Sequence, residues 1–283
     1  MSAITATPTF TRSIPSNIGR QTWFARSVRA EWIKFWTVRS TVWTLVATVV
    51  VMVGISVLAA WGSTVEAVDP GSSMNTAQLL SAGYQVAQLV VAVLGVLTIT
   101  GEYSTGMIRS TFAAVPRRVN VLAAKVLVLS AVVLAVSVVS MALSYVATLP
   151  WQDELGAKLD LTDPETLRMT VGLPLYLMAI ALFAFALGAL LRHSAAALTA
   201  VIAMLLVVEN VLMIIPLRAI ELISPFLPST AGRRVLFDTE MLTATDAVTA
   251  GTGLAPWVGF GVLMVWVLAL GAVAAVLLRR RDA

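Results

Sequence analysis

Six long stretches almost free of charged residues constrain this chain more than any other feature of its sequence. They cover residues 40–65, 70–101, 126–152, 169–191, 195–216 and 247–278, and the only charge within them is that of Glu209. The hydrocarbon core of a bilayer is about 30 Å thick, and an α-helix crosses it in about 20 residues. The stretches therefore predict six transmembrane helices, near residues 41–61, 77–100, 126–149, 169–191, 195–216 and 255–278.

The composition points to the same fold class. Hydrophobic residues make up 59% of the chain and charged residues 12%, whereas a soluble domain uses about 25% charged residues. With no cysteine, disulfides and thiolate metal sites are excluded. We therefore expect an all-α membrane protein with a single transmembrane domain, residues 23–283, after a disordered tail of residues 1–22.

The charges between the spans predict the orientation of the chain. If the N-terminus is cytoplasmic, 14 of the 19 basic residues fall on the inside, opposed there only by Glu31, Glu102 and Asp282. This asymmetry satisfies the positive-inside rule and places both termini in the cytoplasm. The basic pI follows from this topology and from contact with anionic lipid, so it does not indicate nucleic-acid binding.

Residues 23–38 have the pattern of a helix that lies in the membrane interface. Phe24 and Val28 share a helical face with several aromatic side chains, whereas Arg26 and Lys34 point elsewhere. Aromatic rings anchor such helices at the head-group level, and the candidate anchors are Trp23, Trp32, Phe35 and Trp36. The alternative is a cytoplasmic extension of the first span.

Polar side chains at membrane depth are the candidates for a substrate pathway. Gln85 and Gln88 belong to a polar and small stripe of the second span, which should face the protein interior. The stripe serves either helix packing or a pathway. Glu209, next to Asn210, is costly in the membrane. Three roles stay open for Glu209: a protonated group bonded to Asn210 or to a glutamine of the second span, an ionised group beside water, or a proton-coupling group.

The segment between the fifth and sixth spans is long and apolar for a loop on the outer side. We expect short helices there, lying on the outer leaflet or dipping into it. One is expected over residues 231–237, with Ser229 as its N-cap.

No catalytic pattern occurs in the chain. The phosphate-binding sequence GxxxxGK[ST], the HExxH zinc motif and the GxSxG nucleophile motif are all missing. His193, the one histidine, has no partner ligand nearby in sequence, so we expect no metal site. We therefore expect a protein that is not itself an enzyme.

The polar insert at residues 101–118 joins the second and third spans on the cytoplasmic side. It contains Glu102, Gly106, Arg109, Pro116, Arg117 and Arg118 and is followed by Lys125. This pattern resembles that of the permease subunits of type-2 ABC exporters, in its actinobacterial form. Met107 replaces the usual threonine and Phe112 the usual leucine. The resemblance extends to the interfacial helix, the six spans and the run Leu-Pro-Ser-Thr-Ala-Gly at residues 227–232.

The resemblance implies a function. In that family the insert is the coupling surface for a separate ATPase subunit, so Glu102, Gly106, Arg109, Pro116, Arg117 and Arg118 become candidate contacts. Glu102 would also open a helix, where a carboxylate is favoured by the helix dipole. The implied complex contains two ATPase subunits, which bind ATP and Mg²⁺, and a second permease subunit. It would export a substrate across the plasma membrane. The alternatives are a proton-coupled carrier acting alone and a membrane scaffold or immunity protein.

Overall fold

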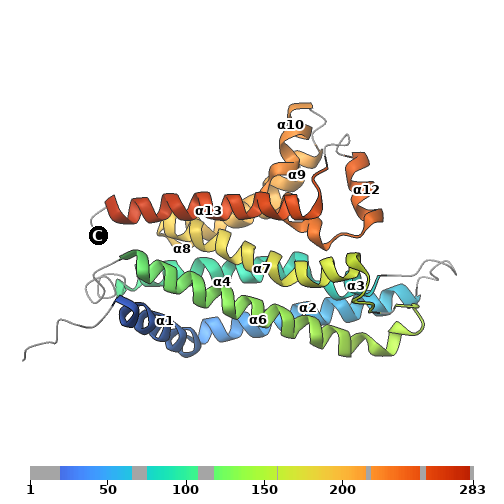
Figure 1. Cartoon of the computed structure of the whole chain (residues 1–283), viewed down its shortest axis with the longest axis horizontal. Coiled ribbons are helices and arrows are strands. Elements are labelled where there is room, and N and C mark those ends of the chain that lie inside the picture. The colour runs from blue at the N-terminus through green and yellow to red at the C-terminus, as the bar shows by residue number, and fades with distance from the viewer. Residues whose placement is uncertain are drawn as a thin grey trace, which may run out of the picture.

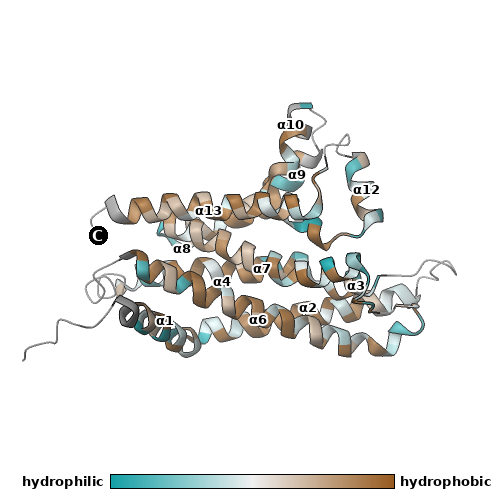
Figure 2. Ribbon diagram, viewed as in Figure 1, coloured by the Kyte–Doolittle hydropathy of each residue, from teal (hydrophilic) through white to brown (hydrophobic). Residues whose placement is uncertain are grey.

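The computed structural model describes residues 20–65, 75–107, 118–157, 159–214, 218–248 and 253–280. These residues form helices and turns without a strand, and six of their helical segments are long and apolar enough to cross a membrane (Figure 2). The segments are α2 (Arg39–Val65), α4 (Tyr84–Ser104), α6 (Arg118–Gln152), α7 (Pro164–Leu191), the run from α8 (Ser194–Ile202) into α9 (Glu209–Ile214), and α13 (Pro256–Arg280). The predicted all-α membrane fold is confirmed.

Helix α1 (Arg20–Thr37) precedes the first span and packs along α6 (Figure 1). Val38 separates it from α2, so it is a helix of its own and not a continuous extension of the span. It begins three residues before the predicted start. Helix α1 and the C-terminal end of α13 lie at the same end of the bundle, as an even number of crossings requires. Its position in the membrane interface stays a prediction.

The second predicted span is two helices. The short α3 (Thr76–Ser81) is separated from α4 by Ala82 and Gly83. A Cβ on Gly83 would lie 2.9 Å from the Met52 Cα of α2, so glycine permits a close approach here. The spanning helix therefore starts later than predicted, at Tyr84, and continues further, to Ser104.

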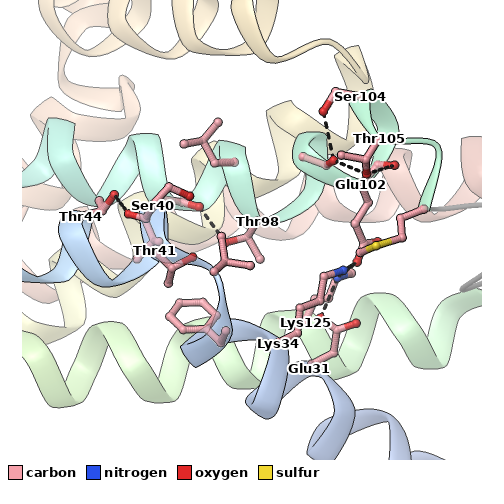
Figure 3. A pocket seen from close by; sticks show the side chains of 16 residues that line it. Glu31, Lys34, Ser40, Thr41, Thr44, Thr98, Glu102, Ser104, Thr105 and Lys125 are labelled. Carbon is pink, nitrogen blue, oxygen red and sulfur yellow. Dashed lines mark hydrogen bonds and ion pairs between the residues drawn. The ribbon is translucent and has the colours of Figure 1, made fainter.

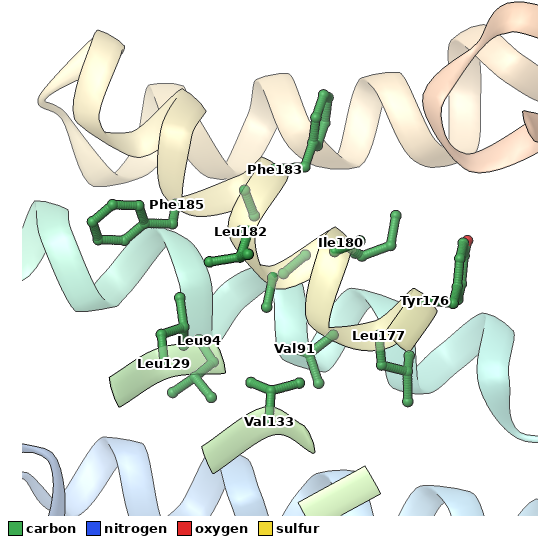
Figure 4. Close-up of a cluster of buried hydrophobic side chains, with 14 of the residues drawn as sticks. Val91, Leu94, Leu129, Val133, Tyr176, Leu177, Ile180, Leu182, Phe183 and Phe185 are labelled. Atoms are coloured by element: carbon green, nitrogen blue, oxygen red, sulfur yellow. The ribbon is translucent and has the colours of Figure 1, made fainter. Parts of the chain in front are cut away.

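Helix α7 forms the centre of the bundle and packs against α4, α6, α8 and α13. Its side chains Leu177, Ile180 and Phe183 are buried. Leu177 lies on the side of Val91 of α4 and Val133 of α6, whereas Phe183 points to the other side of α7 (Figure 4). Helices α4 and α7 come so close that a Cβ on Gly95 would collide with the carbonyl oxygen of Ala181. Small residues allow such backbone contact between membrane helices.

The fourth and fifth spans form an antiparallel hairpin. Arg192 ends α7 in the left-handed region, with φ 55°, and the His193 side chain accepts a hydrogen bond from Ala196 N at the start of α8. Residues 203–208 are a π-helix (η1) between α8 and α9. Beyond it, α9 and α10 (Arg218–Ile223) lead away from the bundle (Figure 1).

The segment between the fifth and sixth spans forms short helices, as predicted. They are α10, the 3-10 turn η2 (Ser224–Phe226), α11 (Pro228–Gly232), the 3-10 turn η3 (Arg233–Leu236) and α12 (Thr239–Val248). Arg168 of α7 donates to the carbonyl oxygens of Arg234 and Phe237, at 3.1 and 2.8 Å. Arg234 in turn makes two bonds to Asp246, at 2.8 and 3.0 Å. These arginines hold the segment against the bundle at the end opposite α1.

Candidate functional site

Four charged side chains meet inside the bundle at the end that carries α1 (Figure 3). Lys125 Nζ donates to Glu31 Oε2 at 2.7 Å and to Glu102 Oε1 at 2.6 Å, and Lys34 Nζ pairs with the same Glu102 oxygen. The exposed fractions of the side chains are 1% for Lys125, 3% for Glu102, 12% for Glu31 and 29% for Lys34. We call Glu31, Lys34, Glu102 and Lys125 the ionic cluster. Its formal charges cancel.

Three helices position the ionic cluster. Glu31 and Lys34 lie three residues apart on α1, a spacing that puts them on one face. Lys125 lies about two turns into α6. Glu102 belongs to the last turn of α4. Glu102 and Lys125 flank the polar insert, so the cluster ties the helix before the insert, the helix after it and α1 to one another.

The prediction that Glu102 opens a helix is wrong. In the last turn of α4 the helix dipole disfavours a carboxylate, because the C-terminal end carries partial negative charge. The ammonium groups of Lys34 and Lys125 compensate for it. Lone acids are costly to bury, and removing one partner of a buried ion pair costs about 3–5 kcal/mol. The burial of Glu102 and the burial of Lys125 therefore depend on each other.

The pKa of Lys34 lies well below its ordinary value. Burial and then the positive charge of Lys125 lower the pKa of Lys34 from 10.5 to about 8, against the opposing effect of Glu31. Between pH 8 and 10.5 the unfolded chain therefore binds more protons at this site than the folded protein. Lys34 consequently makes the folded state more stable as the pH rises through that window.

Beside the ionic cluster lies a cavity of about 310 Å³. It is bounded by α1, the start of α2, the last turns of α4 and Lys125 of α6. Hydroxyl groups and apolar side chains share its lining with the four charged residues (Figure 3). This end of the bundle thus combines a buried charge network with space for a ligand.

The rest of the predicted coupling segment is only partly described. Gly106 has φ 71°, a left-handed conformation that glycine adopts without strain. Arg118 begins α6, but its side chain is outside the description, and Arg109, Pro116 and Arg117 lie outside the described residues. Their contacts with an ATPase stay predictions.

A second polar network lies near the opposite end of the bundle. Tyr176 of α7 donates to Gln88 Oε1 of α4 at 2.5 Å and lies 3.0 Å from Ser229 Oγ of α11. Glu209, which is 2% exposed, accepts from Ser229 N and Thr230 Oγ1, both at 2.8 Å. The network joins four helical elements, α4, α7, α9 and α11.

The partners of Glu209 differ from those expected. Asn210 donates to the Leu206 carbonyl oxygen of its own helix, and Gln88 bonds with Tyr176 instead. Glu209 lies at the start of α11, where it satisfies a free backbone N–H. The prediction that Ser229 caps this helix is wrong, because α11 begins at Pro228 and the Ser229 N–H is itself capped by Glu209. Both carboxyl oxygens of Glu209 are thus engaged by α11.

The pathway candidates divide into two sets. Gln88 and Glu209 are buried in the polar network, whereas Gln85 and Asn210 are exposed on the surface of the bundle. The expectation that the whole stripe of the second span faces the interior is therefore wrong for Gln85. Exposed amides at membrane depth need polar partners or water. Gln85 and Gln88 therefore differ in their surroundings, one at the surface and the other in the polar network.

The aromatic anchors of α1 also separate. Trp32 and Trp36 are exposed and contact each other edge-on, with ring centroids 5.9 Å apart. Phe35 is 6% exposed and packs in the core, so its role as an outward anchor is not supported. The side chain of Trp23 is outside the description.

Sequence reasoning missed four of the residues that build these two networks. Glu31 was counted only as an inside acid, and Lys34 was placed only away from the aromatic face of residues 23–38. Their opposite charges three residues apart were nevertheless a visible signal. Tyr176 carried no signal, because it is one hydroxyl within an apolar segment. Thr230 lies in the run at residues 227–232 that the resemblance includes, but that run does not indicate a bond to Glu209. Among the described residues, no group of three or more His, Asp or Glu side chains is arranged to hold a metal ion.

The fold and the two networks define a multi-pass helical membrane protein. No model of a known protein family matches this chain, and no curated protein matches it either.

We expect Glu102→Gln to destabilise the protein by up to about 3–5 kcal/mol, because Lys34 loses its ion pair and the buried Lys125 keeps only Glu31 as a partner. The double variant Glu102→Gln/Lys125→Met should recover part of this loss. Thermal unfolding in detergent measures both. Glu240→Gln, the same exchange at an exposed acid of α12, is the control. Equal unfolding temperatures for Glu102→Gln and the control would contradict the ionic cluster.

We expect the amine of Lys34 to titrate with a midpoint near 8, and Lys125→Met to move that midpoint upward, because the repelling charge is removed. Competitive acetylation of the folded protein across a pH series, read by mass spectrometry, gives the midpoint. A wild-type midpoint near 10.5, the ordinary value, would contradict the assignment.

We expect Glu209→Leu to lower stability by about 1–3 kcal/mol, because the buried Ser229 N–H loses its acceptor. Glu209→Gln should cost less, since its carbonyl oxygen can still accept. Thermal unfolding again provides the readout. Asn210→Leu, at the exposed neighbouring position, serves as the control. If Glu209→Gln lowers the unfolding temperature as much as Glu209→Leu does, the negative charge of Glu209 itself contributes to stability.

Proposed function

We propose that this chain is the membrane-spanning permease subunit of an ATP-binding-cassette exporter. In this proposal the chain binds no ATP. Two copies of a separate ATPase subunit bind ATP and Mg²⁺, and a second permease subunit completes the complex in the plasma membrane. The motif resemblance of residues 101–118 and the six-span all-α architecture support it.

The ionic cluster is the observation that carries the proposal. The helices on either side of the insert, α4 and α6, are joined to each other and to α1 through Lys125. A force applied to the insert by a partner would therefore reach α1, α4 and α6 together. Buried at 2% exposure, Glu102 would transmit this motion and not touch the ATPase directly. The direct contacts would come from the arginines of the insert.

The exposed amides suggest where a second permease subunit would lie. Gln85 and Asn210 leave polar groups on the surfaces of α4 and α9, within or beside the spanning segments. A seam between two copies along these helices would cover them. A water-filled pathway at that seam would give both amides polar surroundings. In this proposal both termini lie in the cytoplasm, because the distribution of basic residues favours that orientation.

The rival, a proton-coupled carrier, depends on Glu209. This carboxylate already accepts two hydrogen bonds at the start of α11, so a structural role accounts for its burial. The rival also requires the chain to work alone. The two proposals therefore differ in their energy source. A proton gradient would change the accessibility of the spanning helices in the carrier, and ATP hydrolysis would do so in the exporter.

The absence of cysteine makes a direct test possible. The tagged chain, carrying Gln85→Cys as its one thiol, is isolated from native membranes, and co-purifying ATPase is identified by mass spectrometry. In nanodiscs, ATP with Mg²⁺ should change the rate at which a maleimide labels this cysteine. A change driven by a pH gradient across proteoliposomes without ATPase would favour the carrier.

We expect Glu102→Lys to retain the ATPase but to abolish the ATP-dependent change in labelling, because the ionic cluster can no longer connect the three helices. Glu240→Lys, the same charge reversal on exposed α12, should behave like the parent protein. Failure of any ATPase to co-purify with the parent protein would refute the proposed function. A normal response of Glu102→Lys would refute the transmission role alone.

A further inference from the structure

The cavity beside the ionic cluster has the chemistry of a ligand site that the proposed function does not use. It lies where α2 begins and α4 ends, at the level at which the spans start. A volume of about 310 Å³ is within the range of small-molecule sites, about 300–1,000 Å³. It has room for a head group and not for a whole lipid.

The hydroxyl groups of the cavity present hydrogen-bond acceptors. Thr44 donates its proton to the Ser40 carbonyl oxygen at 2.8 Å, and Thr98 donates to that of Leu94 at 2.7 Å. Thr105 donates to the Gly101 carbonyl oxygen at 2.9 Å. A hydroxyl carries one proton and two lone pairs. With the protons directed to the backbone, these oxygens are left to accept from a ligand.

Glu102 contributes a further acceptor. Its Oε1 is engaged by both lysines, whereas its Oε2 is buried without a hydrogen-bond partner among the described residues. A buried carboxylate oxygen left without a donor is costly. Glu102 lines the cavity. A rotation of its carboxyl group would turn this oxygen toward a ligand hydroxyl there and satisfy it.

The charge balance narrows the ligand class. Glu31, Lys34, Glu102 and Lys125 all line the cavity, and their formal charges cancel. A strongly anionic or cationic head group would gain little from this balanced set, because each charge already has a partner. Donors on a neutral head group match the acceptors without disturbing the ion pairs.

The remaining lining is apolar and continues to the outer surface. Phe35, Leu94 and Leu97 line the cavity together with Val38, which is itself 40% exposed. Beyond it on α2, Val42 and Trp43 are exposed as well. An acyl chain attached to a head group in the cavity would thus follow an apolar surface.

We propose that this cavity binds the neutral, hydroxyl-rich head group of a membrane glycolipid. Hydroxyl groups of the sugar donate to Glu102 Oε2 and to the threonine oxygens of α2 and α4. The acyl chains lie along the apolar start of α2. Bound there, the lipid fills the space between α1 and the last turns of α4 and stabilises the position of α1. This site does not depend on the exporter assignment.

The test uses the full chain in nanodiscs that contain phosphatidylcholine and one added lipid. The additions are monoglucosyl diacylglycerol, phosphatidylethanolamine and phosphatidylglycerol, which share acyl chains and differ in head group. Lipid retained by the protein is measured by native mass spectrometry, and affinity by titration. We expect the glucosyl lipid to be retained in preference to the other two.

Two pairs of variants locate the binding. Gly101→Leu should abolish retention, because Gly101 lines the cavity and a Cβ there meets no atom within 4 Å, so the side chain fits and occupies the space. Gly54→Leu on α2, where a Cβ also meets nothing within 4 Å, is the matched control. Thr98→Val should weaken binding about fivefold through loss of one hydrogen bond. Thr64→Val, at the other end of α2, should not.

Unfolding temperatures of the variants confirm that each is folded. The proposal is overturned if the three lipids are retained equally, if phosphatidylglycerol is preferred, or if folded Gly101→Leu retains the glucosyl lipid as the wild type does. A preference for phosphatidylglycerol would show that Lys34 binds a lipid phosphate. A preference for phosphatidylethanolamine would show that Glu102 binds the ammonium group of that lipid.

Discussion

The pairing of Lys125 with Glu31 and Glu102 is the interaction on which the α1 end of the bundle depends. A lysine that is 1% exposed at the start of a spanning helix is tolerated only with its charge neutralised. Its two partners come from α1 and α4, so neutralising one ammonium group also fixes how three helices meet. Helices α4 and α6 therefore cannot move apart at this end without breaking a buried ion pair. The same cluster forms one wall of the cavity.

The opposite end of the bundle is also held by a buried polar network, but one made of hydrogen bonds and not of ion pairs. The short α11 supplies no side chain of its own as a cap, and Glu209 reaches it from the fifth span. Tyr176 then connects Ser229 of α11 to Gln88 of α4. The loop segment is thus anchored to the spans by hydrogen bonds inside the protein. Between the two ends, α7 packs through apolar side chains and close backbone contacts, as at Gly95 and Ala181. Polar networks therefore define the ends, and dispersion and close packing define the middle.

Particular residues show how far the sequence could predict this arrangement. Most span ends were located to within about five residues. The exceptions are the second span, which Gly83 divides into α3 and α4, and the third, whose helix starts at Arg118 and not at residue 126. Glu209 was recognised as unusual, because an acid at membrane depth is costly in any fold. Glu102 was singled out by the pattern of the insert. Their partners were not found. Lys34 and Lys125 lie 68 and 23 positions from Glu102, and Ser229 lies 20 positions from Glu209. No periodicity relates such positions, since their proximity results from how the helices pack. The exposure of Gln85 beside the burial of Gln88 was missed for the same reason.

The sequence by itself determined the fold class and the number of crossings. The thickness of the hydrocarbon core imposes a length and an apolar composition on every span, and both are local properties of the chain. Only the tertiary structure decided what the few polar groups do. It turned Glu102 from the expected start of a surface segment into the buried centre of an ionic cluster, and Glu209 into the cap of a distant helix. The physical reason is that a buried charge must find its counterpart, and that counterpart is chosen by the packing of helices far apart in the chain.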